Sequence, residues 1–399
     1  MQCCFFEDQL LSRFHPLTLT RPLDDLRVGI CTVAEKWKAE LELEHTSRLL
    51  RDTLKGVFEQ PPIDPGEPCL WLNARYLPQE ALLERIHDLE VGSCLRSGDI
   101  EIAAKVDGAE SARWLSNNRA NFNSLLVFET DDFDPLEHLW DLFQVNGREI
   151  RADIERMGHP SSEDHSISPH AVLENRDQIF IGEGVSVEPG AILVATEGPI
   201  YIGPGATICA GAILRGPVAI CRESIVNMGA KIYGASTIGP VCKAGGEINN
   251  SIFHSYSNKG HEGFIGNSLV GQWCNFGADT NTSNLKNNYS TIRLTDWTSM
   301  QQVETGQQFI GTIMGDHSKT AINVQLNTGT VCGVSCNIFT ADFPPKLIPS
   351  FTWVGTNVLQ PYKFDKAVET MEAVMKRRDV ELTENYRNMM ERIAKKSRS

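Results

Sequence analysis

Residues 202–238 carry an aliphatic residue at every sixth position, and a small residue follows each of the first five after four more residues. An α-helix repeats every 3.6 residues and a strand every two, so neither accounts for a period of six. This period is typical of a parallel β-helix, in which a six-residue strand and corner form each side of a coil. We predict that the aliphatic residues point into the core and that the small residues fit the corners. The aliphatic series is Ile202, Ile208, Leu214, Ile220, Val226, Ile232 and Ile238, and the small series is Ala206, Ala212, Val218, Ser224 and Ala230.

The repeat extends on both sides of this stretch and predicts a left-handed parallel β-helix domain over residues 169–362. It is interrupted at 240–263, where the spacing is looser, and by a long excursion at 283–309. Because insertions in solenoids project as loops and often build the binding face, we expect the functional residues at these two interruptions. The other positions in register are Ile181, Val187, Leu193, Phe264, Val270, Phe276, Met314, Thr320, Leu326, Cys332 and Ile338.

Three further segments flank the β-helix. Residues 1–155 alternate short apolar runs with helical patterns, which favours an α/β domain. Residues 156–168 are polar and rich in turn formers, and we interpret them as a linker. Residues 363–399 have helical spacing and predict a charged C-terminal helix, either a cap on the open end of the solenoid or a contact with a neighbouring subunit. In the α/β domain we predict buried strands at 69–72 and 125–128 and helices at 33–50 and 79–90.

Composition narrows the class of protein. The chain has 399 residues, 41% of them hydrophobic, and a formal net charge of −14. This charge argues against a general nucleic-acid binder but permits a local basic pocket for a phosphorylated ligand. The eleven cysteines form no CxxC pair, so we predict reduced thiols in a cytoplasmic protein. The sequence has neither a signal peptide nor an apolar run of about 20 residues, so we expect no membrane partner.

The repeat alone leaves three functions open: acyl transfer from a coenzyme A thioester, a zinc site of histidines shared between subunits, or a structural rod. Such prisms commonly associate side by side, so we expect a homotrimer by analogy of fold. The zinc alternative would be similar to the γ-class carbonic anhydrases and would use His254, His261 and His317. We predict no metal in the β-helix.

Residues 258–284 read NKGHEGFIGNSLVGQWCNFGADTNTSN. A histidine just before a hexapeptide coil, His261, is followed by Gly277, Ala278, Thr280 and Asn284 in the pattern G-A-x-T-x-x-x-N. This resembles the acetyltransferase half of the bifunctional UDP-N-acetylglucosamine diphosphorylase/glucosamine-1-phosphate N-acetyltransferase family. The flanking GGEINNSIFHSYSNKGHEGFIGNS and SNLKNNY are similar to a Bacteroidetes-type branch of that family.

The resemblance implies transfer of an acetyl group from acetyl-CoA to the amine of glucosamine 1-phosphate. His261 would be the general base, since imidazole takes up protons near neutral pH. Asn284 would hold the sugar or orient the base, and Glu247 would orient His261 or contact the sugar. Tyr289 would contact the substrate, and His317 with Lys319 would lie near coenzyme A. The candidate cations for the sugar phosphate are Lys231, Lys259, Lys286 and Lys319, with Arg215 behind them.

The stretch PLTLTRPLDDLRVG at 16–29 resembles the segment after the phosphate loop in sugar-1-phosphate nucleotidyltransferases. In that family a glycine-rich loop cradles the phosphates and an aspartate holds Mg²⁺. Here no glycine precedes Gly29, and Asn73 and Arg75 stand where the aspartate would fall. Asp8 is the candidate substitute for the Mg²⁺ ligand.

Arg21 and Arg27 are the candidate phosphate ligands in this half. Two hypotheses follow for residues 1–155: a divergent domain that transfers a nucleotidyl group from UTP or another NTP, or a degenerate domain kept for oligomer geometry. The alternative for the whole chain is a nucleotidyltransferase alone, with the β-helix as a trimerisation scaffold. The sequence leaves the sugar, the nucleotide base and the acyl chain open.

Overall fold

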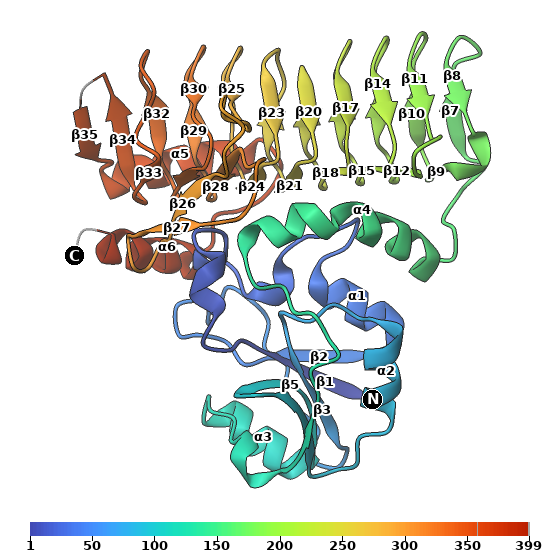
Figure 1. Cartoon of the computed structure of the whole chain (residues 1–399), viewed down its shortest axis with the longest axis vertical. Helices are drawn as coiled ribbons and strands as arrows, with labels where there is room; N and C mark the ends of the chain where they lie inside the picture. Colours follow the sequence, from blue (N-terminus) through green and yellow to red (C-terminus); the bar gives the residue numbers. More distant parts are fainter. Residues whose placement is uncertain (357, 398–399) are drawn as a thin grey trace. The chain divides into compact units, whose positions relative to one another are not determined.

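The structure is a computed structural model, and it describes residues 1–356 and 358–397. The chain divides into two compact units, which are described separately (Figure 1). Unit one comprises 1–14, 20–26 and 31–139, and unit two comprises 15–19, 27–30 and 140–399. The predicted domain boundary at 155 thus lies inside a segment that packs with the β-helix. The predicted boundaries themselves remain predictions.

Unit one is built on a mixed six-stranded sheet (Figure 1). β1 pairs in parallel with β2 and β3, whereas β5 is antiparallel to both β3 and β4. Every residue of β1 and β3 is buried, as expected of strands covered on both faces. In sheet order, the strands are β2 (His45–Arg48), β1 (Gln2–Phe6), β3 (Cys69–Asn73), β5 (Ile100–Val106), β4 (Ser93–Ser97) and β6 (Leu126–Glu129).

Two predictions for unit one were wrong in part. The predicted helix 33–50 ends at Glu40, and residues 45–48 form β2, because pairing with β1 overrides the helical pattern. The strand predicted at 125–128 exists as β6, but it is an edge strand with exposed side chains rather than a buried one. The helices of unit one are α1 (Val33–Glu40), α2 (Glu80–His87) and α3 (Gly108–Ser116), with 3₁₀ turns η1 (Leu11–Phe14), η3 (Leu23–Asp25) and η4 (Phe122–Ser124).

Unit two is a left-handed parallel β-helix with three faces (Figure 1). Face one contains β7 (His165–Ile167), β10 (Val185–Val187), β13 (Thr207–Ile208), β16 (Ile225–Val226), β19 (Lys243–Ala244) and β22 (Asn258–Lys259). Face two contains β8 (Val172–Glu174), β11 (Ile192–Val194), β14 (Ile213–Arg215), β17 (Lys231–Tyr233), β20 (Glu247–Asn249) and β23 (Phe264–Gly266). Face three contains β9 (Ile179–Ile181), β12 (Ile200–Ile202), β15 (Val218–Ile220), β18 (Ser236–Ile238), β21 (Ile252–Ser255), β24 (Leu269–Gln272), β28 (Thr312–Met314), β31 (Thr330–Cys332) and β33 (Leu347–Ile348).

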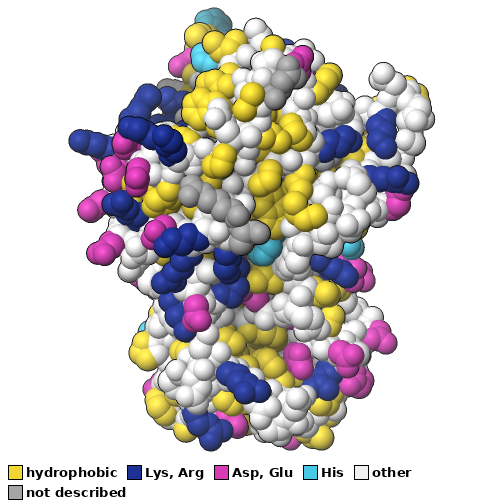
Figure 2. Space-filling view, turned by 90° about the vertical axis from the view of Figure 1, so that its left-hand side faces the viewer, with side chains coloured by type: hydrophobic (Ala, Val, Ile, Leu, Met, Phe, Trp, Pro, Cys, Tyr) yellow, Lys and Arg dark blue, Asp and Glu magenta, His cyan; other side chains and the backbone are white. Residues whose placement is uncertain are grey.

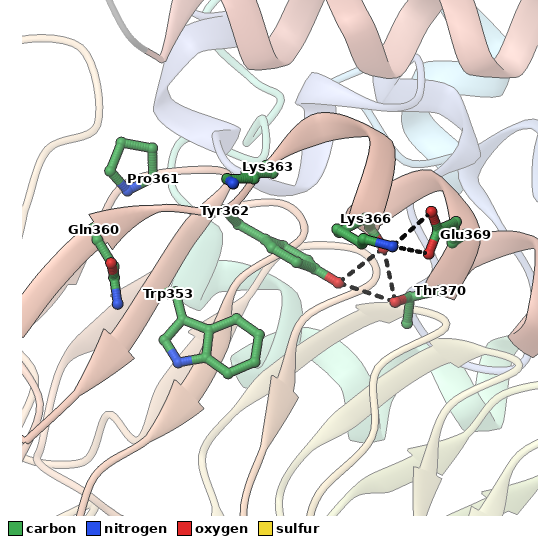
Figure 3. A pocket seen from close by; sticks show the side chains of 8 residues that line it. All are labelled: Trp353, Gln360, Pro361, Tyr362, Lys363, Lys366, Glu369 and Thr370. Atoms are coloured by element: carbon green, nitrogen blue, oxygen red, sulfur yellow. Dashed lines mark hydrogen bonds and ion pairs between the residues drawn. The ribbon is translucent and has the colours of Figure 1, made fainter.

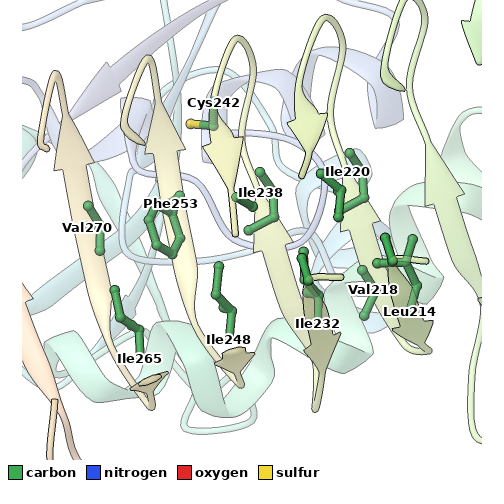
Figure 4. Packing of buried hydrophobic residues seen from close by; sticks show 14 of the residues in the cluster. Leu214, Val218, Ile220, Ile232, Ile238, Cys242, Ile248, Phe253, Ile265 and Val270 are labelled. Carbon is green, nitrogen blue, oxygen red and sulfur yellow. The ribbon is translucent and has the colours of Figure 1, made fainter. Parts of the chain in front are cut away.

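The six-residue repeat is confirmed as three sides of one coil. Ile202 pairs with Ile220 and Ile220 with Ile238, so a regular coil takes 18 residues. Both predicted series are buried, and the aliphatic one forms a continuous core (Figure 4). Four of the five small residues directly precede a strand, whereas Val218 begins β15, so the predicted corner position does not hold for Val218. The ladder hydrogen bonds between coils satisfy the backbone at every side.

The interruption expected at 240–263 is a change of spacing within the coils and not a projecting insertion. Strands β19 to β22 continue all three ladders through this stretch, so it is part of the β-helix. Ile238 pairs with Phe253, which makes this coil 15 residues long instead of 18. The spacing of the core residues changes because some sides of the coil have fewer corner residues. The parallel pairing of the strands still keeps the core residues of successive coils aligned.

The excursion predicted at 283–309 is confirmed. It leaves the β-helix after β25 (Asn281–Thr282) and forms an antiparallel hairpin of β26 (Arg293–Thr295) and β27 (Gln302–Glu304). The last coils contain β29 (Lys319–Thr320), β30 (Gln325–Leu326), β32 (Asn337–Phe339), β34 (Thr352–Gly355) and β35 (Val358–Pro361).

Helices flank the β-helix within unit two. α4 (Leu139–Arg156) lies along face three, where Asn146 Nδ2 donates to Thr237 Oγ1 at 3.0 Å. The predicted linker 156–168 is therefore short, since β7 already pairs with β10. Short 3₁₀ turns η2 (Leu17–Leu19) and η5 (Arg176–Gln178) also belong to this unit.

The C-terminal segment forms two helices rather than the single predicted one. They are α5 (Phe364–Lys376) and α6 (Glu384–Lys396), separated at Asp379, whose φ is +55°. Arg378 Nη2 donates to Asn258 Oδ1 at 3.1 Å, so this segment lies against the side of the coils and does not only cap their end. Residues 357, 398 and 399, which the predicted β-helix and helix include, lie outside the described residues.

Three observations bear on the predicted class of protein. All eleven cysteines are free, and nine are buried. None of the described helices is long and apolar enough to cross a bilayer. On the face drawn in Figure 2, Lys and Arg side chains are interspersed with Asp and Glu.

Candidate functional site

Residues 260–263 form a turn that connects face one to face two and carries His261. The side chain of His261 is exposed, whereas the backbone of the turn is held from several sides. Each of its four carbonyl oxygens accepts a hydrogen bond. Asn227 Nδ2 donates to the carbonyl of Gly260 at 2.7 Å, and Lys259 Nζ donates to the carbonyl of His261 and, at 2.9 Å, to that of Glu262. The amide of Asp279 also donates to the carbonyl of Glu262, at 2.9 Å, and the amide of Glu247 donates to that of Gly263 at 3.1 Å.

Lys259 does not face solvent, contrary to its predicted role as a ligand for the sugar phosphate. It is 1% exposed and pairs with Ala244, so it takes an inward position of the β-helix. Its ammonium is within the protein and bonds the backbone of the turn, which leaves it unable to reach a bound phosphate. The same column of inward positions on face one is Ile167, Val187, Ile208, Val226, Ala244 and Lys259.

This burial predicts a pH dependence of stability. Desolvation lowers the pKa of Lys259 to about 8, although Glu262 and Asp279 act in the opposite direction. An unfolded lysine titrates near pH 10.4, so between about pH 8 and 10.4 the unfolded chain binds a proton that the folded chain has lost. Stability from this group therefore rises with pH across that window.

We expect the free energy of unfolding of the wild type, minus that of Lys259→Met, to increase by roughly 2–3 kcal/mol from pH 7 to pH 10. Urea denaturation of both proteins at several pH values measures this difference, and contributions from the buried thiols cancel in it. A difference that stays flat with pH would show that the ammonium is solvated.

Face two brings Lys231 and Glu247 next to the turn. Lys231 pairs with Glu247 and Glu247 with Phe264, so these side chains form one outward column. Tyr233 Oη donates to Glu247 Oε1 at 2.7 Å, and this hydrogen bond is the main cause that raises the pKa of Tyr233 to about 12. Arg215 lies on the same face, where its guanidinium is 3.5 Å from Glu197.

Asn284 lies near this face, at the start of the excursion. Its Nδ2 donates to Asn267 Oδ1 at 2.8 Å, and Asn267 directly follows β23. Lys286 is half-buried and its Nζ donates to the carbonyl of Thr291 at 2.5 Å. Tyr289 is 66% exposed on the excursion. The structure thus connects Asn284 to face two, whereas Lys286 and Tyr289 belong to the projecting segment.

His317 and Lys319 were predicted to lie near coenzyme A, but the structure does not leave them open to a ligand. His317 is 2% exposed, its Nε2 is 2.9 Å from Tyr386 Oη of α6, and its ring stacks at 6.1 Å on Trp273. Lys319 Nζ donates to the carbonyl of His317 at 2.8 Å, and burial lowers its pKa to about 8. The coenzyme A contact predicted for this pair is therefore not supported, because α6 covers the histidine.

The zinc alternative fails on geometry. His254 Nδ1 is 3.1 Å from Ser255 Oγ, and His317 bonds Tyr386 instead of another histidine. Throughout 1–356 and 358–397, no three His, Cys, Asp or Glu side chains come together as metal ligands. The three histidines thus do not form one site.

In unit one, Asp8 follows β1 and meets the end of β3. Its Oδ2 accepts from Arg75 Nε at 2.7 Å and from Asn73 Nδ2 at 2.8 Å, and Arg75 Nη2 forms an ion pair with the same oxygen at 2.7 Å. The amide of Leu10 donates to Oδ1 at 2.9 Å. Both charged side chains are almost fully buried, at 2% and 1% exposure. Asn73 and Arg75, which stand where a metal ligand was expected, thus bind the candidate ligand itself.

This arrangement does not fit Mg²⁺. A guanidinium occupies the side of the carboxylate that a cation would take, and Mg²⁺ requires several free oxygen ligands. Replacing Arg75 with methionine leaves a buried carboxylate without its cation, which we expect to cost roughly 3–5 kcal/mol of stability. Thermal unfolding measures the loss. The double variant Asp8→Asn/Arg75→Met should recover most of it, and an Arg75→Met protein that keeps wild-type stability and binds Mg²⁺ would contradict the assignment.

The two predicted phosphate ligands of the N-terminal half lie in different units. Arg21, in unit one, donates to Asp25 Oδ2 at 3.0 Å and is 1% exposed. Arg27, in unit two, bonds the carbonyls of His254, at 3.1 Å, and Ile30. Both arginines are buried and hydrogen-bonded, which favours structural roles.

A concavity lies at the C-terminal end of unit two (Figure 3). It has a volume of about 390 Å³ and lies between β34, β35 and α5. Trp353 stacks on Phe339 at 5.1 Å, and Tyr362 Oη is 2.9 Å from Thr370 Oγ1. This concavity contains none of the residues predicted from the sequence.

Sequence reasoning missed Asn227, Tyr233 and Asn267. Asn227 holds the turn, Tyr233 bonds Glu247, and Asn267 bonds Asn284. Their signal is positional, because Tyr233 and Asn267 contact the next coil and Asn227 contacts the coil after the next. These contacts could be predicted from the sequence only if the number of residues in each coil were known, and that number changes in this region.

The comparisons with known proteins match parts of the chain. Residues 3–160 match the sugar nucleotidyl transferase family. A protein named bifunctional protein GlmU from Methanocaldococcus jannaschii is 28% identical over 162 residues, which cover 41% of this chain and 32% of that protein. Its namesake from Methanococcus vannielii is 31% identical over 118 residues, 30% of this chain and 26% of the other.

Parts of the chain are thus similar to parts of the bifunctional GlmU proteins. The chain spans only about a third of the length of the M. jannaschii GlmU protein. Among solved structures, the acetyltransferase domain of PglB from Neisseria gonorrhoeae covers 90% of this chain and 98% of its own, with 11% identity and a TM-score of 0.19. The likeness to the GlmU proteins is thus one of sequence.

Proposed function

We propose that the protein is a two-part transferase of sugar-nucleotide biosynthesis. Its β-helix would transfer the acetyl group of acetyl-CoA to the amine of an amino-sugar 1-phosphate, glucosamine 1-phosphate. The observation that carries this proposal is the exposed His261 on a turn with a fixed backbone, next to the polar column of Lys231 and Glu247. The GlmU relatives support the same class of reaction.

The chemistry follows from these side chains. The amine nitrogen attacks the thioester carbonyl carbon, the carbon–sulfur bond breaks, and His261 takes the proton that the nitrogen releases. The departing thiolate then gains a proton to give free coenzyme A. Lys231 would offset the negative charge of the sugar phosphate, and Glu247, held by Tyr233, would fix the amino sugar. Asn284 would close the site from the excursion.

For unit one we infer nucleotidyl transfer from an NTP, UTP in the first instance, to the sugar 1-phosphate. The match of residues 3–160 to the sugar nucleotidyl transferase family supports this inference. Because the residues around Asp8 do not fit Mg²⁺, no step is assigned to a metal there. Incubation with UTP, N-acetylglucosamine 1-phosphate and Mg²⁺ tests the activity, and absence of pyrophosphate would favour a degenerate domain.

Acetyl transfer is tested by thiol detection with acetyl-CoA and glucosamine 1-phosphate. Release of coenzyme A that depends on the amino sugar supports the proposal. Pyrophosphate release without coenzyme A release would favour the alternative, a nucleotidyltransferase whose β-helix only assembles the oligomer. A homotrimer and a cytoplasmic location remain predictions, and sedimentation velocity tests the first.

A further inference from the structure

Lys259 breaks the rule that defines the β-helix core. Every preceding inward position of its column carries an aliphatic residue or alanine, and these side chains fill the interior. A lysine at such a position brings an ammonium into the protein, which costs several kcal/mol unless hydrogen bonds compensate for lost water. A charged residue at a core position that gains nothing in packing is expected at functional or strained sites.

Among the described contacts, the hydrogen bonds that compensate for this burial all go to one segment of the backbone. Lys259 Nζ donates to the carbonyls of His261 and Glu262, which are consecutive residues of the turn 260–263. The carboxylates of Glu262 and Asp279 add favourable charge near the ammonium. The contacts of this lysine are thus concentrated on the backbone that carries the exposed imidazole.

The residues next to the Lys259 ammonium are small and leave room for it. Ala244, the neighbour of Lys259 in the previous coil, is small, and a Cβ on Gly246 would lie 2.8 Å from Lys259 Nζ. The same Cβ would lie 2.8 Å from the carbonyl oxygen of His261. A side chain at position 246 would therefore displace both partners of the hydrogen bond.

Lys319 provides an internal comparison. It also donates to the carbonyl of a histidine two residues away, His317, and burial lowers its pKa as well. That histidine is covered by Tyr386, whereas His261 is exposed. The same device thus fixes two histidine backbones, but only the turn held by Lys259 presents its ring to solvent.

We propose that Lys259 is a positioning residue that holds the His261 turn in the backbone conformation from which the imidazole meets the substrate amine. This inference rests on the proposed acetyl transfer. It assigns the lysine no contact with substrate, because the ammonium is buried. Loss of the lysine would let the turn sample other conformations, and small displacements of a catalytic group reduce turnover more than binding.

The test compares wild type, Lys259→Met, Lys259→Arg and Lys243→Met. Methionine keeps length and suits an apolar core but removes the donors, whereas arginine keeps charged donors. Lys243 is one coil earlier, beside the residue that pairs with Lys259, and provides the matched control. Acetyl-transfer kinetics give kcat and KM, and hydrogen exchange of the peptide covering 258–266 reports the turn without depending on activity.

For Lys259→Met we expect kcat to fall about tenfold or more, KM for both substrates to stay within about twofold, and exchange at 258–266 to become faster. Lys259→Arg should recover part of kcat, and Lys243→Met should match the wild type. A folded Lys259→Met protein with wild-type kcat overturns the inference, whatever its exchange. If the wild type itself releases no coenzyme A, the acetyltransferase proposal fails. Faster exchange in Lys259→Met would then still show that the lysine holds the turn.

Discussion

Replacing His261 with alanine is expected to lower kcat for acetyl transfer by roughly 10²–10⁴-fold, the usual contribution of a general base. The imidazole acts on a proton that moves in the transition state, so KM for glucosamine 1-phosphate should change little. The fold should be unaffected, because the exposed ring lies outside the core and the backbone of the turn keeps its hydrogen bonds. Thiol release under saturating acetyl-CoA measures the effect.

The matched control for this substitution is His170→Ala. His170 is also exposed, but it lies at the first coil, far along the chain from the turn. It should keep wild-type turnover. Unchanged turnover in His261→Ala, or an equal loss in His170→Ala, would rule out His261 as the base.

The second large effect concerns the spacing of the coils. Gly239 follows β18, and its amide donates to the carbonyl of Phe253 at 3.0 Å. A Cβ on this residue would lie 1.9 Å from the carbonyl oxygen of His254 and 2.4 Å from that of Phe253. Both atoms belong to the backbone of the next coil, so no rotation of a side chain relieves the clash.

We therefore expect Gly239→Ala to destabilise unit two by more than about 3 kcal/mol. Circular dichroism and urea denaturation measure the loss. Gly355→Ala is the control, because a Cβ there meets open space, and it should unfold like the wild type. Equal stability of the two variants would contradict this prediction, because it would mean that adjacent coils can move apart to accommodate the added Cβ.

The fold could be predicted from the sequence because the core of a β-helix repeats in the primary structure itself. Ile202 to Ile238 are spaced by six since each regular side has six residues, and no distant contact is needed to detect this. The helix predicted at 33–50 failed for the opposite reason, because pairing of β2 with β1 is a long-range interaction. Burial of β6 could not be predicted either, since it depends on its position at the edge of the sheet.

The candidate site was predicted only in part. His261, Glu247 and Lys231 lie close together. The resemblance located His261 and Glu247 through local motifs, whereas Lys231 was only one of several candidate cations for the sugar phosphate. The inward direction of Lys259 was missed because successive core residues here are Ala244, Ile248, Phe253 and Lys259, separated by four, five and six positions. Counting by six from Ala244 reaches Asn250 and Tyr256 instead. The burial of His317 depends on α6, a contact 69 residues away in sequence.

The shortened coil also has a geometric consequence for the prism. A strand advances about 3.3 Å per residue, so the 15 residues from Ile238 to Phe253 enclose a perimeter roughly 10 Å smaller than an 18-residue coil. The next coil, from Phe253 to Val270, carries the His261 turn and has 17 residues. The prism is therefore narrowest one coil before the turn, and this narrowing arises from deleted corner residues rather than from added loops.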